Sequence, residues 1–89
     1  MSNQSKEFLA QYGSKEHLDK LVDDPDPYVR ETVAYHSKEH LDKLINDENP
    51  YVRVAVAKNG NQDHLEKLIH DPHYEVNNAA NKRLKELNK

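Results

Sequence analysis

The sequence has no cysteine, and it has only two glycines and four prolines among its 89 residues. The lack of cysteine excludes disulfides, thiolate metal sites and iron–sulfur clusters from these residues. No apolar run approaches the length of a membrane span, and no basic start followed by an apolar run resembles a signal peptide. These absences predict a soluble, cytoplasmic protein.

Charge and aliphatic content are also limited. Thirteen Lys and Arg stand against sixteen Asp and Glu, so a global basic field that would favour nucleic acid or anionic membranes is missing. Leu, Ile, Val and Phe together make 19 of the 89 residues, which is close to the composition of disordered chains. A single domain of this size buries only roughly 60–65% of the surface of its unfolded chain. The spacing of the apolar residues therefore decides between order and disorder.

What the sequence does have is an internal repeat. The segments SKEHLDKLVDD at Ser14, SKEHLDKLIND at Ser37 and NQDHLEKLIHD at Asn61 align at spacings of 23 and 24 residues. A proline-containing turn follows each segment, and then YVRETVA, YVRVAVA or EVNNAAN. Each unit is too short to bury its own apolar face, whereas stacked units can share a continuous core.

The first segment of each unit carries apolar residues at i, i+3 and i+4, which predicts one face of a short helix. These residues are Leu18, Leu21 and Val22; Leu41, Leu44 and Ile45; and Leu65, Leu68 and Ile69. Ser14, Ser37 and Asn61 are the expected N-caps of these helices.

The second segment predicts another helix, which starts at a cap followed by proline. The expected caps and prolines are Asp26 and Pro27, Asn49 and Pro50, and Asp71 and Pro72. The expected core pairs, each four residues apart, are Val29 with Val33, Val52 with Val56, and Val76 with Ala80.

The predicted fold is all-α: a right-handed α-helical solenoid (α-α superhelix) of about three and a half helix-pair repeats, with about seven short helices in one domain, 1–89. A half repeat at 1–13 is predicted because EFLAQYGSKEHL aligns on VAVAKNGNQDHL. Repeats at 14–36, 37–60 and 61–89 follow, and the last has an extended C-terminal capping helix with Leu84 and Leu87.

The phrase DPDPYVRETVA together with HLDKL resembles the leucine-rich repeat variant, which is similar in style to the short helical HEAT repeat. The resemblance implies that an Asp six residues before an Arg bridges neighbouring repeats. Asp24 with Arg30 and Asp47 with Arg53 match this spacing, and the series is expected to end at Asn77. The resemblance also implies that one helix of a pair can be a 3₁₀ helix and that the fold serves as a general binding scaffold.

Histidines and acidic turns invite metal hypotheses. His17, His40 and His64 occupy the same place in each unit, so we expect a column with neighbours about 8–10 Å apart, too far for one zinc ion. A capping or packing role is predicted for them instead. The acidic turns lack the glycine and the distal glutamate of calcium loops. No metal site, cofactor site or catalytic constellation is predicted, and the two glycines are expected to stop helices.

The positions at which the units differ are the most informative about function, because folding explains the shared ones. The outer face of the second helices carries Tyr28, Glu31 and Tyr35; Tyr51, Val54 and Lys58; and Glu75, Asn78 and Lys82. Like helices are expected to line up into one surface, with Val54 facing solvent beside the tyrosines. Tyrosine combines a large contact area with a polar tip, which is typical of binding surfaces. The alternative is that Tyr28 and Tyr51 only pack over the turn prolines.

The sequence therefore predicts a non-enzymatic protein–protein interaction module, a small adaptor or inhibitor with a protein or peptide partner. The predicted partner-binding residues are Tyr28, Glu31, Tyr35, Tyr51, Val54 and Lys58. The alternatives are a HEAT-like nucleic-acid-binding module, against which Glu31 and Glu75 argue, and a structural fragment of a larger scaffold. A monomer is expected, with end-to-end self-association as the other possibility. Lys82, Arg83, Lys85 and Lys89 suit a solvated helix C-terminus, or else a contact to phosphate or an acidic partner.

Overall fold

The computed structural model describes residues 9–10 and 13–88, and within these ranges it contains helices and no strand. The elements are α2 (Lys15–Leu21), α3 (Pro27–His36), η1 (Lys38–His40), α4 (Leu41–Leu44), α5 (Pro50–Asn59), α6 (Gln62–Leu68) and α7 (Tyr74–Leu87). The prediction of an all-α fold is confirmed. The predicted half repeat at 1–13 lies mostly outside the described residues.

The second helices α3 and α5 begin as the sequence predicts. Asp26 and Asn49 accept hydrogen bonds from the main-chain N–H groups of Tyr28 and Tyr51 at 2.9 and 2.8 Å. A proline follows each cap as the first helical residue. Its fixed φ suits that position, and its missing N–H leaves no donor unpaired.

The predicted start of α7 is wrong. The helix begins at Tyr74 and its N-cap is His73, whose Nδ1 accepts a hydrogen bond from the main-chain N–H of Glu75 at 3.2 Å. Pro72 lies before this cap and so is not the first helical residue. Asp71 serves instead as the ion-pair partner of Arg53.

The first helices are shorter, and one of them is divided. Helices α2 and α6 are single α-helices, whereas the corresponding segment after Ser37 is the 3₁₀ turn η1 followed by the one-turn helix α4. The 3₁₀ geometry that the family resemblance implied is therefore present in this one segment of the described chain. A short 3₁₀ turn at a helix N-terminus is common because its tighter hydrogen bonds satisfy groups that an α-helix leaves free.

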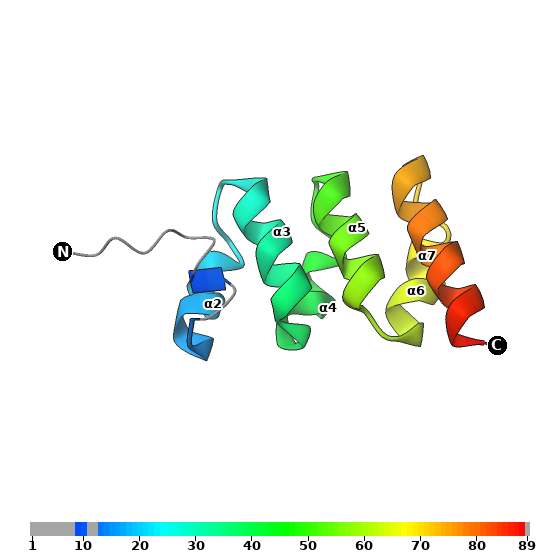
Figure 1. The fold of residues 1–89 in the computed structure, drawn as a ribbon. Helices are drawn as coiled ribbons and strands as arrows, with labels where there is room; N and C mark the ends of the chain where they lie inside the picture. The colour runs from blue at the N-terminus through cyan, green and yellow to red at the C-terminus, as the bar shows by residue number, and fades with distance from the viewer. Residues whose placement is uncertain (1–8, 11–12, 89) are drawn as a thin grey trace.

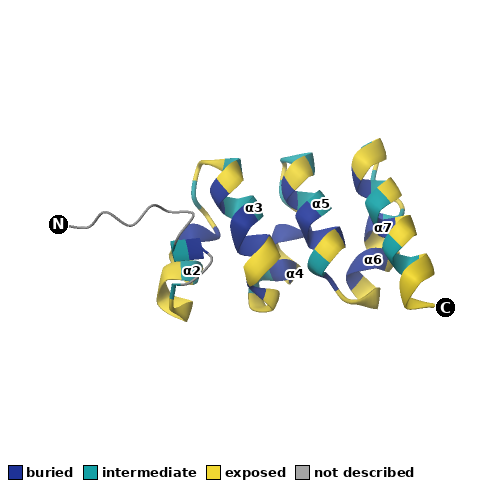
Figure 2. Cartoon of the chain, in the orientation of Figure 1, coloured by how far each residue is buried: buried dark blue, intermediate teal, exposed yellow. Residues whose placement is uncertain are grey.

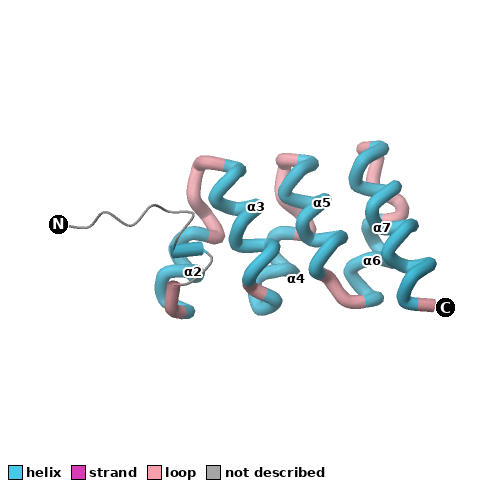
Figure 3. Tube along the Cα trace, in the orientation of Figure 1, coloured by secondary structure: helices cyan, strands magenta, loops and turns pink. Residues whose placement is uncertain are grey.

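The helices form two packed layers. Figure 1 shows α3, α5 and α7 side by side in one row; α4 and α6 lie behind this row, and α2 lies at its left end, beside α3. Helix α5 packs against both α3 and α7, and α6 packs against α5 and α7. The connecting turns lie at the two edges of the row (Figure 3). Helix α5 therefore lies between α3 and α7 in the row.

The core lies between the layers, where buried residues of successive helices face one another (Figure 2). The predicted pairs are confirmed, since each of the six residues is at most 1% exposed: Val29, Val33, Val52, Val56, Val76 and Ala80. Leu41, Leu44, Leu65 and Leu68 cover this stripe from the other layer. Full burial of one such side chain contributes about 1.5–3 kcal/mol, so ordered stacking compensates for the low aliphatic content.

In the part of the chain that the structure describes, no helix is both long enough and apolar enough to cross a lipid bilayer.

Candidate functional site

The candidate site is the outer face of α3 and α5, here called the ridge and made of Tyr28, Glu31, Tyr35, Tyr51, Val54 and Lys58. Tyr28 and Tyr51 are 57% and 52% exposed, so much of both rings is open to solvent. Tyr35 and Lys58 are also exposed, and Glu31 is half-buried. The ridge therefore offers aromatic surface, with one carboxylate on α3 and one ammonium group on α5.

The expectation that Val54 faces solvent holds only in part. Its side chain is half-buried and packs against the core cluster, beside Ala79 of α7. A helical wheel of α5 alone placed Val54 opposite the buried valines, but the wheel does not include the neighbouring helix. The packing of α7 against α5 covers part of that face.

Tyr51 is tied to the start of α7. Its hydroxyl donates a hydrogen bond to Oε1 of Glu75 at 3.5 Å, and its ring meets the His73 ring edge-on with centroids 6.3 Å apart. These contacts restrict the ring without burying it. An ordered but exposed aromatic side chain loses little further freedom on binding, which favours a role in recognition. Tyr74 is the most exposed tyrosine of the described residues at 71%, and the sequence did not single it out.

A groove runs between α5 and α7 next to the ridge, with a volume of about 330 Å³. Val54 and Ala79 supply its apolar surface, while Lys58, Lys82 and Arg83 supply its cationic groups. Glu75 and Glu86 also line it. This feature is called the α5–α7 groove below.

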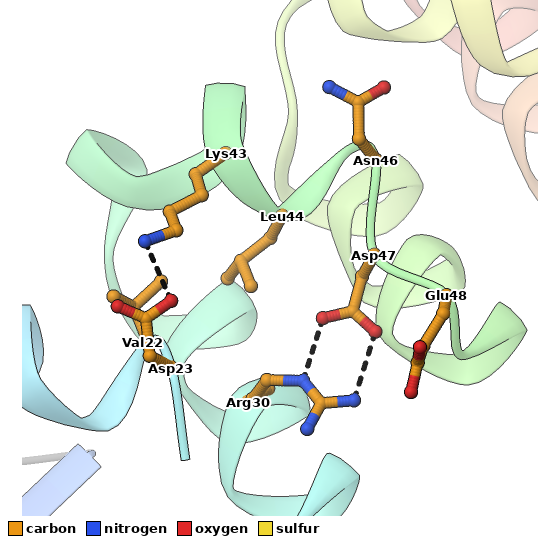
Figure 4. A pocket seen from close by; sticks show the side chains of 8 residues that line it. All are labelled: Val22, Asp23, Arg30, Lys43, Leu44, Asn46, Asp47 and Glu48. Carbon is orange, nitrogen blue, oxygen red and sulfur yellow. Dashed lines mark hydrogen bonds and ion pairs between the residues drawn. The ribbon is translucent and has the colours of Figure 1, made fainter. Parts of the chain in front are cut away.

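A second hollow, of about 380 Å³, lies at the turns between α2, α3 and α4 (Figure 4). Nε and Nη2 of Arg30 donate to the two carboxylate oxygens of Asp47 at 2.7 and 3.1 Å, and Nζ of Lys43 pairs with Asp23 at 2.6 Å. Four of its five charged residues thus neutralise one another in pairs. Because these charges are already paired, the hollow is a place where ion pairs connect the helices and not a candidate ligand site.

The expected pairing of each Arg with the Asp six residues before it is only partly right. Arg30 donates to the main-chain carbonyl of Asp24 at 2.6 Å, whereas the carboxylate that it binds belongs to Asp47 of the next unit. Arg53 likewise donates to the carbonyl of Asp47 at 2.7 Å and binds the carboxylate of Asp71 at 2.7 and 3.1 Å. The links between units thus run from each Arg forward to the next Asp.

The end of this series is at Asn77, as expected. Its side-chain amide donates to the carbonyl of Asp71 at 3.0 Å, so the bond within the unit persists without the charge. Burial opposes ionisation of Asp71, but hydrogen bonds from Arg53 and from the main chain of His73 outweigh it and lower the pKa of this carboxyl. The hydrogen bonds to Asp47 raise the pKa of Arg30.

The column of histidines forms a second set of links that the sequence did not reveal. Nε2 of His40 lies 2.7 Å from Oδ1 of Asp19, and Nε2 of His64 lies 2.6 Å from Oδ1 of Asp42. Each imidazole thus contacts a carboxylate of the preceding unit. Hydrogen bonds from His40 and then Lys15 lower the pKa of Asp19. The available signal was the shared HLD phrase, which places Asp19 and Asp42 at equivalent positions.

The Nδ1 atoms of these histidines contact the residues that precede the helices. Nδ1 of His64 accepts the main-chain N–H of Asn61 at 3.1 Å, and Nδ1 of His40 lies 2.6 Å from the Ser37 hydroxyl. These contacts agree with the capping role that was predicted for the histidines. Within residues 9–10 and 13–88, no group of three or more His, Asp or Glu side chains is arranged to hold a metal ion.

We expect His64 to be the Nε2–H tautomer. A main-chain N–H can only donate, so Nδ1 of His64 is unprotonated and Nε2 carries the hydrogen that reaches Asp42. Long-range ¹⁵N–¹H correlation spectra near neutral pH distinguish the two tautomers. Exposed His70, whose ring makes no hydrogen bond to the described residues, is the control and should exchange between tautomers. Spectra of an Nδ1–H ring at His64 would contradict the assignment.

A third set of links joins the C-terminal ends of the second helices. Asn59 of α5 donates to the carbonyl of Ala34 at 2.9 Å, and Nη1 of Arg83 donates to the carbonyls of Ala57, Lys58 and Gly60 at 2.8–3.1 Å. Asn59 and Arg83 are 24 residues apart in the sequence and act in the same way. Arg83 is therefore held between helices and is not part of a freely solvated basic tail.

Comparison with known proteins gives no assignment, because no protein-family model, curated protein or solved structure matches this chain.

Proposed function

We propose that this chain is a non-enzymatic interaction module, a small cytoplasmic adaptor or inhibitor that presents the ridge to a protein or peptide partner. In this proposal the helices form a right-handed solenoid of about three and a half repeats, similar to the leucine-rich repeat variant and HEAT families. The observation that carries the proposal is the exposure of Tyr28, Tyr35 and Tyr51 along two packed helices. Tyrosine is among the residues most enriched at energetically important interface positions.

The distribution of polar contacts supports binding over catalysis. Each of four side chains binds a carboxylate of a neighbouring unit: Arg30, Arg53, His40 and His64. Catalytic acids, bases and nucleophiles usually converge in a cleft. Here the ionisable groups that lie closest together are distributed along the array at equivalent positions, as structural links are.

The proposal is tested with a partner isolated on the full chain and with the variant Tyr51→Ala/Val54→Ala. Loss of the Tyr51 ring and of part of the Val54 surface should weaken binding at least about tenfold, because interface tyrosines commonly contribute more than about 1 kcal/mol. Titration calorimetry measures the affinity, and far-UV circular dichroism should show unchanged helicity. Tyr74→Ala, which removes a more exposed ring that lies outside the ridge, is the control. Equal affinities of wild type and double variant would remove the ridge from consideration.

Nucleic-acid binding is the second candidate, and one observation favours it. Lys58 and Lys82 line the same groove, and neither pairs with a carboxylate among the described residues. Glu31 and Glu75 on the same side oppose it. A salt titration of binding to duplex and single-stranded DNA discriminates the two, since phosphate binding weakens steeply with salt.

A further inference from the structure

We propose that the α5–α7 groove binds an acidic, partly apolar peptide segment, with an aliphatic side chain against Val54 and Ala79 and a carboxylate between Lys58 and Lys82. The inference rests on the proposed function, because it names the chemistry of the partner that a site beside the ridge would accept.

The apolar part of the argument is the composition of the groove surface. Val54 and Ala79 are both partly buried against the core and both line the groove, so apolar atoms are reachable from solvent at its base. A volume of about 330 Å³ falls at the lower end of the range of small ligand sites, and suits one or two side chains. No aromatic side chain of the described residues lines the groove, so it offers no platform on which a base could stack.

The cationic part of the argument is the placement of the lysines. Lys58 and Lys82 are 24 residues apart, so they occupy equivalent positions on neighbouring packed helices. No carboxylate among the described residues forms an ion pair with either. Arg83 lies beside them and is held by three carbonyls of α5 and its C-cap. A bound carboxylate would give the two lysines the ion-pair partner that they lack among the described residues.

The carboxylates of the groove limit the kind of anion that it accepts. Glu75 lies in the first turn of α7 and accepts the Tyr51 hydroxyl, while Glu86 lies near the other end of the helix. The cationic segment at Lys58 and Lys82 is thus bounded by negative charge in both directions along α7. Such an arrangement suits a single carboxylate in a peptide better than the continuous charge of a nucleic-acid backbone.

The same positions one unit earlier differ in chemistry. Glu31 stands where Val54 stands, and Tyr35 stands where Lys58 stands, so the α3 side of the ridge has neither the aliphatic surface nor the cation. The acidic peptide is therefore assigned to the α5–α7 groove. The neighbouring tyrosines of the ridge are free to contact the remainder of the partner.

The experiment is a selection from a random linear-peptide library on the folded full chain, wild type and Lys58→Glu/Lys82→Glu in parallel. Wild type should enrich peptides with Asp or Glu within a few residues of Leu, Ile, Val or Met. The double variant should enrich Lys or Arg in place of the acidic residues and should bind the wild-type peptides at least about tenfold more weakly by fluorescence anisotropy. Lys67→Glu/Lys85→Glu, which changes the net charge equally outside the groove, is the matched control and should keep the wild-type preference.

The outcomes separate this inference from the proposed function. No enrichment on wild type, enrichment that ignores the charge reversal, or an equal loss in the control variant would each overturn the groove proposal. If the Tyr51→Ala/Val54→Ala variant still loses its partner in those cases, the ridge remains a binding surface and only the peptide chemistry is wrong. Circular dichroism of each variant verifies that the helices are intact.

Discussion

Arg53→Met is expected to lower the free energy of unfolding by about 3–5 kcal/mol, which is the usual cost of removing one partner from a buried ion pair. The side chains of Arg53 and Asp71 are only 16% and 7% exposed, and they form two hydrogen bonds with each other. Arg53 also donates to the carbonyl of Asp47. Methionine keeps most of the volume but leaves both acceptors without this donor. Urea unfolding followed by circular dichroism measures the loss.

The double variant Arg53→Met/Asp71→Asn provides the control. Asparagine removes the charge but can still accept the main-chain N–H of His73, which Asp71 accepts at 2.9 Å. The double variant should therefore be more stable than Arg53→Met alone. A loss equal to the sum of the two single losses would show that Arg53 and Asp71 do not interact energetically.

The pH dependence of the same variants has a defined sign. Folding lowers the pKa of Asp71 below its ordinary 3.8, so its ionised form stabilises the fold above about pH 4. That contribution is lost as the pH falls through the lowered pKa. The stability difference between wild type and Arg53→Met should consequently shrink in acid. A difference that stays constant below about pH 4 would contradict the role assigned to the ion pair.

Gly60→Ala is expected to destabilise the protein by about 1–3 kcal/mol, the usual cost of forcing extra atoms into a packed site. A Cβ at residue 60 would lie 2.7 Å from the carbonyl oxygen of Val56 and 2.8 Å from Cβ of His64. Main-chain and Cβ atoms cannot move aside as a flexible side chain can, so α5 and α6 must shift apart. Thermal unfolding followed by circular dichroism measures the change.

The sign of the Gly60 effect makes this prediction informative. The φ of Gly60 is −80°, which any residue adopts, so backbone conformation alone would let alanine raise stability by about 0.4–1 kcal/mol. Only the close approach of α5 and α6 turns that gain into a loss. An increase in the unfolding temperature would therefore show that the two helices separate easily. Gly60 stops α5 as expected, but without the left-handed conformation that often ends helices.

The fold class followed from local patterns. Apolar residues at helical spacing predicted the buried pairs of α3, α5 and α7, and caps followed by proline predicted where α3 and α5 begin. These features depend on residues a few positions apart, so the sequence contains all the information that they need. The same reasoning failed at α7, where a proline was present but lay before the cap.

The candidate site was predictable only in part. The exposed tyrosines follow from their place on the helix face away from the valines, whereas the half-burial of Val54 depends on α7, which no helical wheel of α5 includes. The α5–α7 groove was missed for the same reason, because its surface is shared by residues about a full repeat apart. Arg83 illustrates the point. In the sequence it looks like one more residue of a basic tail, and only the structure shows that it binds the carbonyls of α5.

Residue type and spacing alone determined that this chain is helical, which helix faces are apolar, and which residues of the second helices lie on the outer face. Tertiary structure decided which carboxylates Arg30 and Arg53 bind, that histidines join the first helices of successive units, and where a groove opens beside the ridge. The physical reason is the range of the interactions. Hydrogen bonds, caps and amphipathic stripes act within about one helical turn, but ion pairs and grooves depend on helix packing that brings residues 17 to 26 positions apart into contact.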